Sequence, residues 1–186
     1  MTKRLLLIDI DGVLADCKHR LPYQKAKDYD RFYSEGEMLR DKVIVQGQTF
    51  VDRLRSNIYS DRPHFVLITG RPRRTMFVTN LWCEAKFKYL DPDAVIARPD
   101  GDYRPSDVVK LERLDEYLDM LYHQEFPNEC GRKYKNKKIE DKRRLWMKKM
   151  FDSDENYYVD DDPKNVDAIC EAYPEIIGLV FGTERV

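Results

Sequence analysis

Near its N-terminal end the chain carries an apolar run that leads into two aspartates and a glycine, Leu5-Leu6-Leu7-Ile8-Asp9-Ile10-Asp11-Gly12. The four apolar residues show no alternation with polar ones, which is typical of a strand buried on both faces of a parallel sheet. Open α/β sheets bind their ligands at the carboxyl edge, where this strand would end. The sequence therefore predicts that Asp9 and Asp11 lie at a ligand-binding edge.

These two aspartates also indicate a chemistry. Nearby carboxylates repel each other unless a cation or a shared proton relieves them, and hard oxygen ligands favour Mg²⁺. One aspartate could act as a nucleophile and the other as an acid and base, which would divide the hydrolysis of a phosphate ester into two steps. We therefore expect Mg²⁺ as the cofactor and a phosphorylated molecule as the substrate.

Composition narrows the class of protein. A chain of 186 residues is long enough for one domain with a sizeable core, and 33 basic residues balance 34 acidic ones. Global charge therefore indicates neither a nucleic-acid binder nor a protein of the membrane surface. No stretch approaches a membrane span, and the four cysteines lack metal-ligand spacing. We expect a cytoplasmic protein with reduced thiols and no membrane partner.

The rest of the chain alternates strand-like and helix-like patterns, which favours an α/β fold with helices on both faces of a sheet. The expected strands after the first are 64–68, 94–97, 156–159 and 175–181, and the expected helices are 43–58, 76–85, 105–121 and a short one after Pro163. We predict a single domain over residues 1–186, a Rossmann-like three-layer sandwich with a mostly parallel sheet and a minimal cap.

Two stretches depart from this alternation. The first, about residues 14–42, is polar with interspersed aromatic residues and would form a small cap. Its aromatic residues could stack a base, although a loop that packs its own aromatic side chains is the commoner outcome. The second, about 125–150, would be an insertion that ends in an amphipathic helix. Its basic part, 132–149, could follow a nucleic-acid backbone or form a solvated helix face.

Three further features stand where strands end or helices begin. They are Thr69, Lys110 and the acidic triplet Asp160-Asp161-Asp162. Phosphoryl transfer needs cations and hydrogen-bond donors around the equatorial oxygens. Asp160 and Asp161 would complete the magnesium site, while Thr69 and Lys110 would hold the phosphoryl oxygens. Asp162 is expected to cap the helix that begins at Pro163.

Together these motifs resemble the haloacid dehalogenase (HAD) superfamily of phosphohydrolases. The residues that carry the resemblance occur in the order of the four motifs of that superfamily: Asp9-Ile10-Asp11-Gly12-Val13-Leu14, Ile68-Thr69-Gly70-Arg71-Pro72, Lys110 and Val159-Asp160-Asp161. The resemblance implies Asp9 as the phosphorylated nucleophile and Asp11 as the general acid and base. It also implies that the magnesium ligands come from Asp9, the main-chain carbonyl of Asp11, Asp160 and Asp161.

A narrower resemblance concerns the segment before Lys110. The stretch 98–110, with Asp107-Val108-Val109-Lys110 at its end, is similar to the phosphatase domain of bacteriophage polynucleotide kinase. That domain removes 3′-phosphates from nucleic acids or nucleotides. The resemblance therefore implies a nucleic-acid 3′ end as substrate. It also implies that the candidate substrate-binding residues are Gly70, Arg71, Arg98 and Arg104.

Two other functions stay open at this point. A phosphatase that acts on a nucleoside monophosphate or a sugar phosphate would use the same motifs, because substrate choice depends on the loops around a site. A nucleic-acid-binding module without catalysis would use the basic stretch 132–149 instead. The sequence gives neither the oligomeric state nor a kinase partner.

Overall fold

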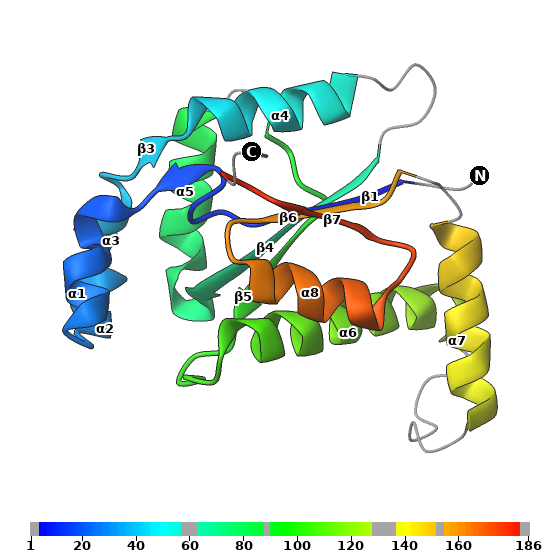
Figure 1. Cartoon of the computed structure of the whole chain (residues 1–186). Coiled ribbons are helices and arrows are strands. Elements are labelled where there is room, and N and C mark those ends of the chain that lie inside the picture. Colours follow the sequence, from blue (N-terminus) through cyan, green and yellow to red (C-terminus); the bar gives the residue numbers. More distant parts are fainter. Residues whose placement is uncertain (1–3, 57–62, 88–89, 128–136, 152–154, 183–186) are drawn as a thin grey trace.

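A five-stranded parallel sheet forms the centre of the computed structural model (Figure 1). The residues described are 4–56, 63–87, 90–127, 137–151 and 155–182. The strand order is β5-β4-β1-β6-β7, with β1 at Leu5–Ile8, β4 at His64–Pro72, β5 at Ala94–Arg98, β6 at Tyr157–Asp160 and β7 at Ile177–Val180. Because β1 is central and the later strands add on either side of it, the strand order reverses at β1.

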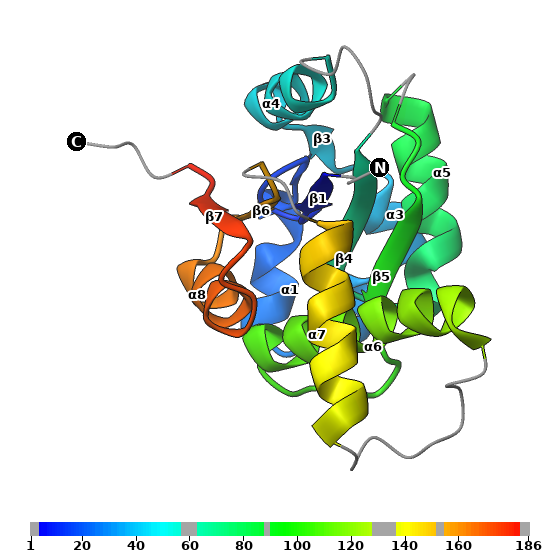
Figure 2. The same cartoon turned by 90° about the vertical axis from the view of Figure 1, so that its right-hand side faces the viewer.

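Helices cover both faces of this sheet (Figure 2). Leu5 and Leu7 face helices α6 (Ser106–Glu125), α7 (Lys137–Met150) and α8 (Pro163–Ala172), whereas Leu6 and Ile8 face α4 (Val45–Ser56) and α5 (Met76–Lys86). Successive strand residues point to opposite faces, so a strand between two helical layers is apolar throughout. The predicted three-layer α/β sandwich is confirmed.

The strand ends differ from the prediction in one way that affects the site. Strand β4 continues past Ile68 to Pro72, and its pairing with β5 shifts register between Thr69 and Pro72. A bulge of this kind bends a strand and redirects its side chains. The residues that follow the predicted strand 64–68 are therefore part of the sheet edge, and Thr69 and Arg71 lie in the protein interior.

The stretch predicted as a small cap contains short helices on a two-stranded base. Strands β2 (Ala15–Asp16) and β3 (Lys42–Val43) pair in antiparallel fashion. Between them lie the 3₁₀ helix η1 (Lys18–Arg20) and the helices α1 (Leu21–Lys25), α2 (Tyr29–Phe32) and α3 (Glu35–Met38). Helices of four or five residues are too short to show a periodicity in the sequence. These elements, from Ala15 at the start of β2 to Val43 at the end of β3, are referred to below as the 15–43 segment.

The basic insertion ends in helix α7, which packs on α6. Trp146 and Met147 are buried there, and the Trp146 Nε1 donates to Glu125 Oε2 at 2.7 Å. Of the predicted basic stretch, residues 132–136 lie outside the described residues. Among the helices that the structure describes, none is long and apolar enough to cross a membrane.

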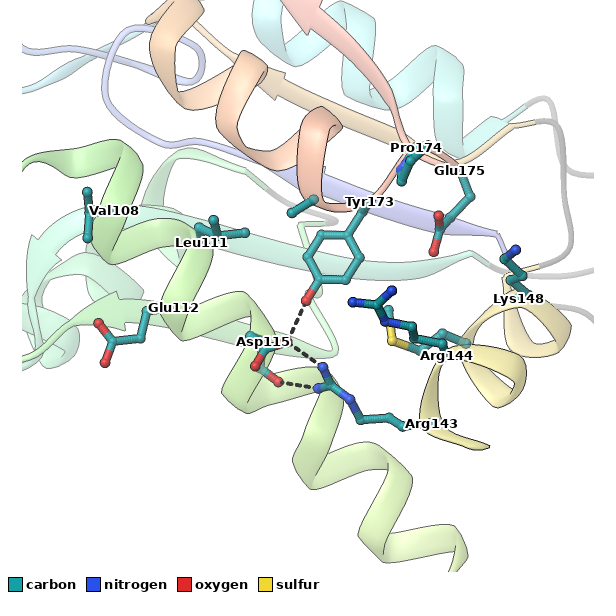
Figure 3. Close-up of a pocket in the computed structure, with 12 residues that line it drawn as sticks. Val108, Leu111, Glu112, Asp115, Arg143, Arg144, Lys148, Tyr173, Pro174 and Glu175 are labelled. Atoms are coloured by element: carbon teal, nitrogen blue, oxygen red, sulfur yellow. Dashed lines mark hydrogen bonds and ion pairs between the residues drawn. The ribbon is translucent and has the colours of Figure 1, made fainter. Parts of the chain in front are cut away.

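A cavity of about 1020 Å³ lies between α6, α7 and the end of α8 (Figure 3). Its charged lining comprises Arg143, Arg144 and Lys148 and the acidic Glu112, Asp115 and Glu175. Arg143 Nη2 donates to Asp115 Oδ1 at 2.6 Å, and the Tyr173 hydroxyl donates to the same oxygen at 2.8 Å. Arg143 therefore meets an acidic partner in this cavity, and the mixed charges of the lining do not form a uniformly positive surface there.

Candidate active site

The two central strands bring Asp9 and Asp160 side by side. Asp9 directly follows β1, Asp160 is the last residue of β6, and the register pairs Ile8 with Val159. The Asp9 amide donates to the Val159 carbonyl at 2.9 Å, which continues the ladder to the sheet edge. This edge is the point where the strand order reverses, and such points bind ligands in open α/β folds.

Lys110 reaches this edge from near the start of α6. Its Nζ lies 3.0 Å from Asp9 Oδ1 and 2.6 Å from Asp160 Oδ2, and its side chain is 3% exposed. Burial by itself would lower the pKa of Lys110, but the two carboxylates outweigh it and raise that pKa. The lysine therefore carries its positive charge between two buried carboxylates.

Asp160 is held by a set of hydrogen bonds and is fully buried. The side-chain Nδ2 of Asn165 donates to Asp160 Oδ1 at 3.0 Å and to Asp160 Oδ2 at 3.1 Å. The Tyr158 hydroxyl also donates to Asp160 Oδ2. The Asp162 amide donates to Oδ1 at 2.9 Å. Asp162 itself caps α8, as predicted, by accepting from the Lys164 amide at 3.0 Å. These contacts fix the orientation of the Asp160 carboxylate.

Three carboxylates at this edge could hold a metal ion. One oxygen from each of Asp9, Asp160 and Asp161 lies within 4.8 Å of the others. Their three negative charges exceed the single positive charge of Lys110, so a divalent cation would balance the group. Burial is the main cause that raises the pKa of Asp9 well above its usual range and that of Asp161 to about 6, and Asp160 adds repulsion to both. An all-oxygen donor set with surplus negative charge fits a hard cation.

Gly12 allows Asp161 to lie close to the loop after β1. Its φ is +87°, and a Cβ at this position would lie 2.1 Å from Asp161 Oδ2. Glycine therefore meets two requirements here, a left-handed backbone and an unobstructed approach of the carboxylate.

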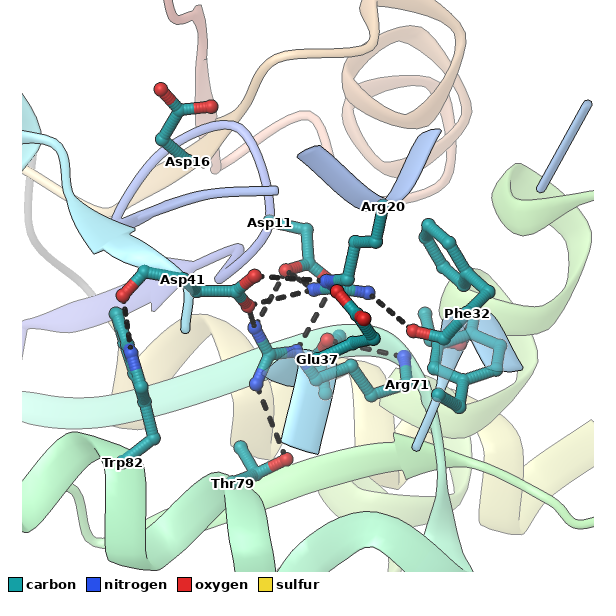
Figure 4. A network of polar contacts seen from close by, with 12 residues as sticks. Asp11, Asp16, Arg20, Phe32, Glu37, Asp41, Arg71, Thr79 and Trp82 are labelled. Atoms are coloured by element: carbon teal, nitrogen blue, oxygen red, sulfur yellow. Dashed lines mark hydrogen bonds and ion pairs between the residues drawn. The ribbon is translucent and has the colours of Figure 1, made fainter. Parts of the chain in front are cut away.

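Asp11 faces a pair of arginines (Figure 4). Asp11 Oδ1 accepts from Arg20 Nη2 at 2.5 Å and from Arg71 Nη2 at 2.6 Å, while Oδ2 accepts from Arg71 Nε at 3.0 Å. Burial opposes ionisation, but the two guanidinium groups outweigh it and lower the pKa of Asp11 below its usual value. Asp11 is therefore held as a carboxylate in this structure.

Asp41 completes this network from the other side. Its Oδ1 accepts from Arg20 Nε at 2.9 Å, and its Oδ2 accepts from Arg20 Nη2 at 2.9 Å and Arg71 Nη2 at 2.8 Å. Asp41, Arg20 and Arg71 all have fully buried side chains. Sequence reasoning missed Arg20 and Asp41, because their segment has no periodicity and an isolated ion pair leaves no local pattern.

A cavity of about 270 Å³ opens above these groups. The predicted site residues in its lining are Asp9, Asp11, Gly70, Arg98, Lys110 and Asp161, and it is also lined by Tyr33, Ser106 and Asn165. Asn165 Oδ1 is buried and has no hydrogen-bond partner among the described residues. The catalytic candidates Asp9, Asp11 and Lys110 and the metal-binding candidate Asp161 therefore line one cavity, whereas Asp160 is buried behind it.

Three other predicted site residues, Thr69, Arg71 and Arg104, do not line this cavity. Thr69 is buried, and its hydroxyl accepts from the Arg71 amide at 3.2 Å. Arg71 lies beneath the cavity with its guanidinium bonded to Asp11, Asp41 and Thr79. Arg104 is half exposed, and its Nη2 lies 2.7 Å from Asp102 Oδ2 and 2.6 Å from Glu112 Oε2. In this structure neither arginine lines the cavity, so their predicted contacts with a substrate stay predictions.

Comparison with known proteins adds fold neighbours. No family model matches the chain, and no curated protein is significantly similar to it. One solved structure, described as "Structure of the Pnkp1/Rnl/Hen1 RNA repair complex", is similar with a TM-score of 0.57 and 16% identity over 98% of this chain. A second, "Structure of Pnkp1/Rnl/Hen1 complex", is similar with a TM-score of 0.54 and 16% identity over 96%. The match spans 44% and 45% of those longer chains, and similarity at this identity shows the fold alone.

Proposed function

We propose that the protein is a HAD-type phosphatase, a Mg²⁺-dependent hydrolase of phosphomonoesters that works through an aspartyl-phosphate on Asp9. One observation carries the proposal. Asp9 opens onto a cavity together with Lys110 and Asp161, and Asp160 lies directly behind them. This set supplies a nucleophile, a buried cation and a cation-binding group within one small space, which are the requirements of phosphoryl transfer.

In the first step a carboxylate oxygen of Asp9 attacks the phosphorus, and the bond from phosphorus to the ester oxygen breaks. The ester oxygen leaves as an alcohol after it takes a proton from Asp11, which must enter this step in its protonated form and not as the carboxylate that Arg20 and Arg71 favour in this structure. Lys110 and the main chain around Gly70 lie at the cavity and would neutralise or bind the phosphoryl oxygens.

In the second step water attacks the phosphorus of the aspartyl-phosphate while the Asp11 carboxylate takes a proton from that water. The bond between phosphorus and the Asp9 oxygen breaks, which releases phosphate and restores both aspartates. Arg20 and Arg71 stabilise the carboxylate form of Asp11. The geometry of the resting protein thus suits the form of Asp11 that this second step uses.

The cation would be held by the carboxylates of Asp9, Asp160 and Asp161. When bound, Mg²⁺ supplies positive charge that neutralises the carboxylates and the phosphoryl oxygens. Asn165 and Tyr158 would keep Asp160 oriented for that ligation, since both donate to its carboxylate.

For the substrate we favour a 3′-phosphorylated polynucleotide end or nucleotide. The fold neighbours come from structures of an RNA repair complex, which supports this choice over a small metabolite. Arg98 lines the cavity, and its Nη2 donates to none of the described residues, so it is placed to meet a phosphate. A phosphatase of a nucleoside monophosphate or sugar phosphate is the second candidate.

The test is phosphate release with and without Mg²⁺ from a 3′-phosphorylated oligonucleotide, beside 5′-phosphorylated, nucleotide and sugar-phosphate substrates. Asp9→Asn provides the blank, and Asp52→Asn, which changes an exposed carboxylate on α4, is the matched control. We expect Mg²⁺-dependent release that Asp9→Asn abolishes and Asp52→Asn preserves. Acid quenching during turnover should trap phosphate on the peptide that contains Asp9.

The outcomes separate the candidates. Selective release from the 3′-phosphate supports the polynucleotide end, whereas selective release from a small phosphate keeps the chemistry and removes the nucleic-acid substrate. Absence of release from every substrate, combined with salt-dependent oligonucleotide binding that Asp9→Asn leaves unchanged, would favour a binding module instead.

A further inference from the structure

Two aromatic rings meet where the 15–43 segment approaches the loop after β5. Tyr29 belongs to α2 and Tyr103 to that loop, and their ring centroids lie 5.8 Å apart with an interplanar angle of 40°. Tyr103 is 75% exposed, so most of its ring is free of protein contact. Exposure of an aromatic ring to water is unfavourable because the ring is largely apolar. A ligand with a flat π face could stack on the ring of Tyr103 and remove that surface from water.

Hydrogen bonds hold the backbone on both sides of Tyr103. Arg98 Nη1 donates to the carbonyls of Asp102 at 3.1 Å and Arg104 at 2.7 Å, the two residues that flank Tyr103. The Arg104 amide also donates to Asp102 Oδ1 at 3.0 Å. Because the backbone on both sides of Tyr103 is hydrogen-bonded, little backbone freedom would be lost when a ligand stacks on its ring.

The same residues connect this ring pair to the catalytic cavity. Arg98 lines the cavity, and its Nε donates to the Gly70 carbonyl at 3.1 Å. Tyr33, which follows Tyr29 by one helical turn, also lines the cavity and donates to the same carbonyl at 3.3 Å. Both members of the ring pair are thus attached to the cavity wall, one through the loop after β5 and one through α2.

We propose that Tyr103, supported by Tyr29, stacks on the nucleobase of the nucleotide whose phosphate enters the cavity. The proposal rests on the proposed phosphatase function and specifies its substrate class as a nucleotide or polynucleotide end. A base and a 3′-phosphate project from different sides of the sugar, so the base can lie at the cavity rim while the phosphate reaches Asp9. Stacking tolerates any base, because every base has a π face.

The test compares two substrates that differ only in the base, a nucleoside 3′-monophosphate and the corresponding abasic sugar 3′-phosphate. The proteins are the wild type, Tyr103→Ala, Tyr103→Trp and the control Phe126→Ala. Phe126 is an aromatic residue that follows α6, about 24 Å along the helix from Lys110 at the cavity. Thermal unfolding of each variant shows whether it is folded.

We expect the wild type to prefer the substrate with a base by about 5- to 150-fold in kcat/KM, which corresponds to typical stacking on one aromatic residue. Tyr103→Ala should remove this preference by raising the KM for the substrate with a base, while its kcat stays the same, since stacking acts equally in the ground and transition states. Turnover of the abasic substrate should be unchanged. Tyr103→Trp and Phe126→Ala should keep the preference.

Two results would overturn the stacking site. If the wild type turns over both substrates equally, or if the preference survives Tyr103→Ala, the site is wrong while the phosphatase function stands. If wild-type protein releases no phosphate from any substrate relative to Asp9→Asn, the proposed function fails, and the subsite fails with it.

Discussion

Asp11 and Asp41 are bound by the same two arginines, although they lie thirty positions apart in the sequence. Arg20 and Asp41 belong to the 15–43 segment, whereas Asp11 and Arg71 belong to the loop after β1 and the end of β4. Two negative and two positive charges therefore balance across the boundary between this segment and the sheet. The segment is therefore joined to the candidate acid and base, and to the end of β4, by these ion pairs.

Asp41→Asn should destabilise the protein. The change leaves two buried guanidinium groups with a single carboxylate, and removal of one partner from a buried ion pair costs about 3–5 kcal/mol. Chemical denaturation would measure the loss in the free energy of unfolding. Asp52→Asn is the control, since its carboxylate is exposed on α4. Equal stability of the two variants would mean that the network contributes nothing.

Gly12→Ala should disturb the cation-binding group more than a matched change elsewhere. Gly12 and Gly101 both have positive φ, at +87° and +76°, but only a Cβ at Gly12 would contact Asp161, because nothing lies within 4 Å of a Cβ at Gly101. Backbone strain of about 1–2 kcal/mol is common to both alanine variants. The excess loss of stability and activity in Gly12→Ala measures the displacement of Asp161. Indistinguishable variants would show that Asp161 moves without consequence.

Lys110→Met should make the protein more responsive to Mg²⁺. Without the ammonium group, Asp9 and Asp160 face each other uncompensated, so the metal-free variant should unfold at a lower temperature than the wild type. A divalent cation would relieve this repulsion, and ligand binding to the folded state raises stability. Thermal unfolding in EDTA and in increasing MgCl₂ would show a larger upward shift for the variant. A shift as small as that of the wild type would count against a cation between these carboxylates.

Cys17 should react slowly with alkylating reagents even though it lines the candidate active-site cavity. Burial, with a further contribution from Asp11, raises the pKa of its thiol to about 12. The thiolate is the reactive form, so at pH 8 its fraction is about one in ten thousand, and the rate should increase about tenfold per pH unit. Mass spectrometry of iodoacetamide-treated protein would follow this peptide. The same peptide in urea should react at least ~100-fold faster, and rapid labelling of folded protein at pH 7 would refute the expectation.

The parts of the site that the sequence predicted are those with a local pattern. An unbroken apolar run marks β1, and the position of Asp9 at its end follows from that run alone. Asp160 lies at the end of β6, which the apolar residues before it predict. Asp162 lies at the N-cap of α8, which Pro163 predicts as a helix start. In these cases the secondary structure of a few neighbouring residues determines where the side chain lies.

The sequence does not predict the ion-pair network of Asp11, Arg20, Asp41 and Arg71, because it depends on contacts between distant segments; it indicates Arg71 only as a candidate substrate-binding residue. Arg71 follows a strand end, where an arginine can turn toward a substrate or into the protein. Its buried position depends on Asp41 and Thr79, which no spacing connects to it. Arg20 likewise lies in a segment of short helices without a repeating apolar pattern. Only the folded arrangement shows that both arginines bind Asp11.

The hydrogen bond from the Trp82 indole to the Asp41 carbonyl, at 2.9 Å, has a spectroscopic consequence. The chain has two tryptophans, and they lie in the cores on opposite faces of the sheet, Trp82 with α5 and Trp146 with α7. The fluorescence of Trp82 should therefore change when the 15–43 segment separates from α5, and the fluorescence of Trp146 should change when α7 separates from α6. A Trp146→Phe protein carries a single tryptophan, at the first of these junctions, so tryptophan emission excited selectively over that of the 12 tyrosines can follow that segment without an added dye.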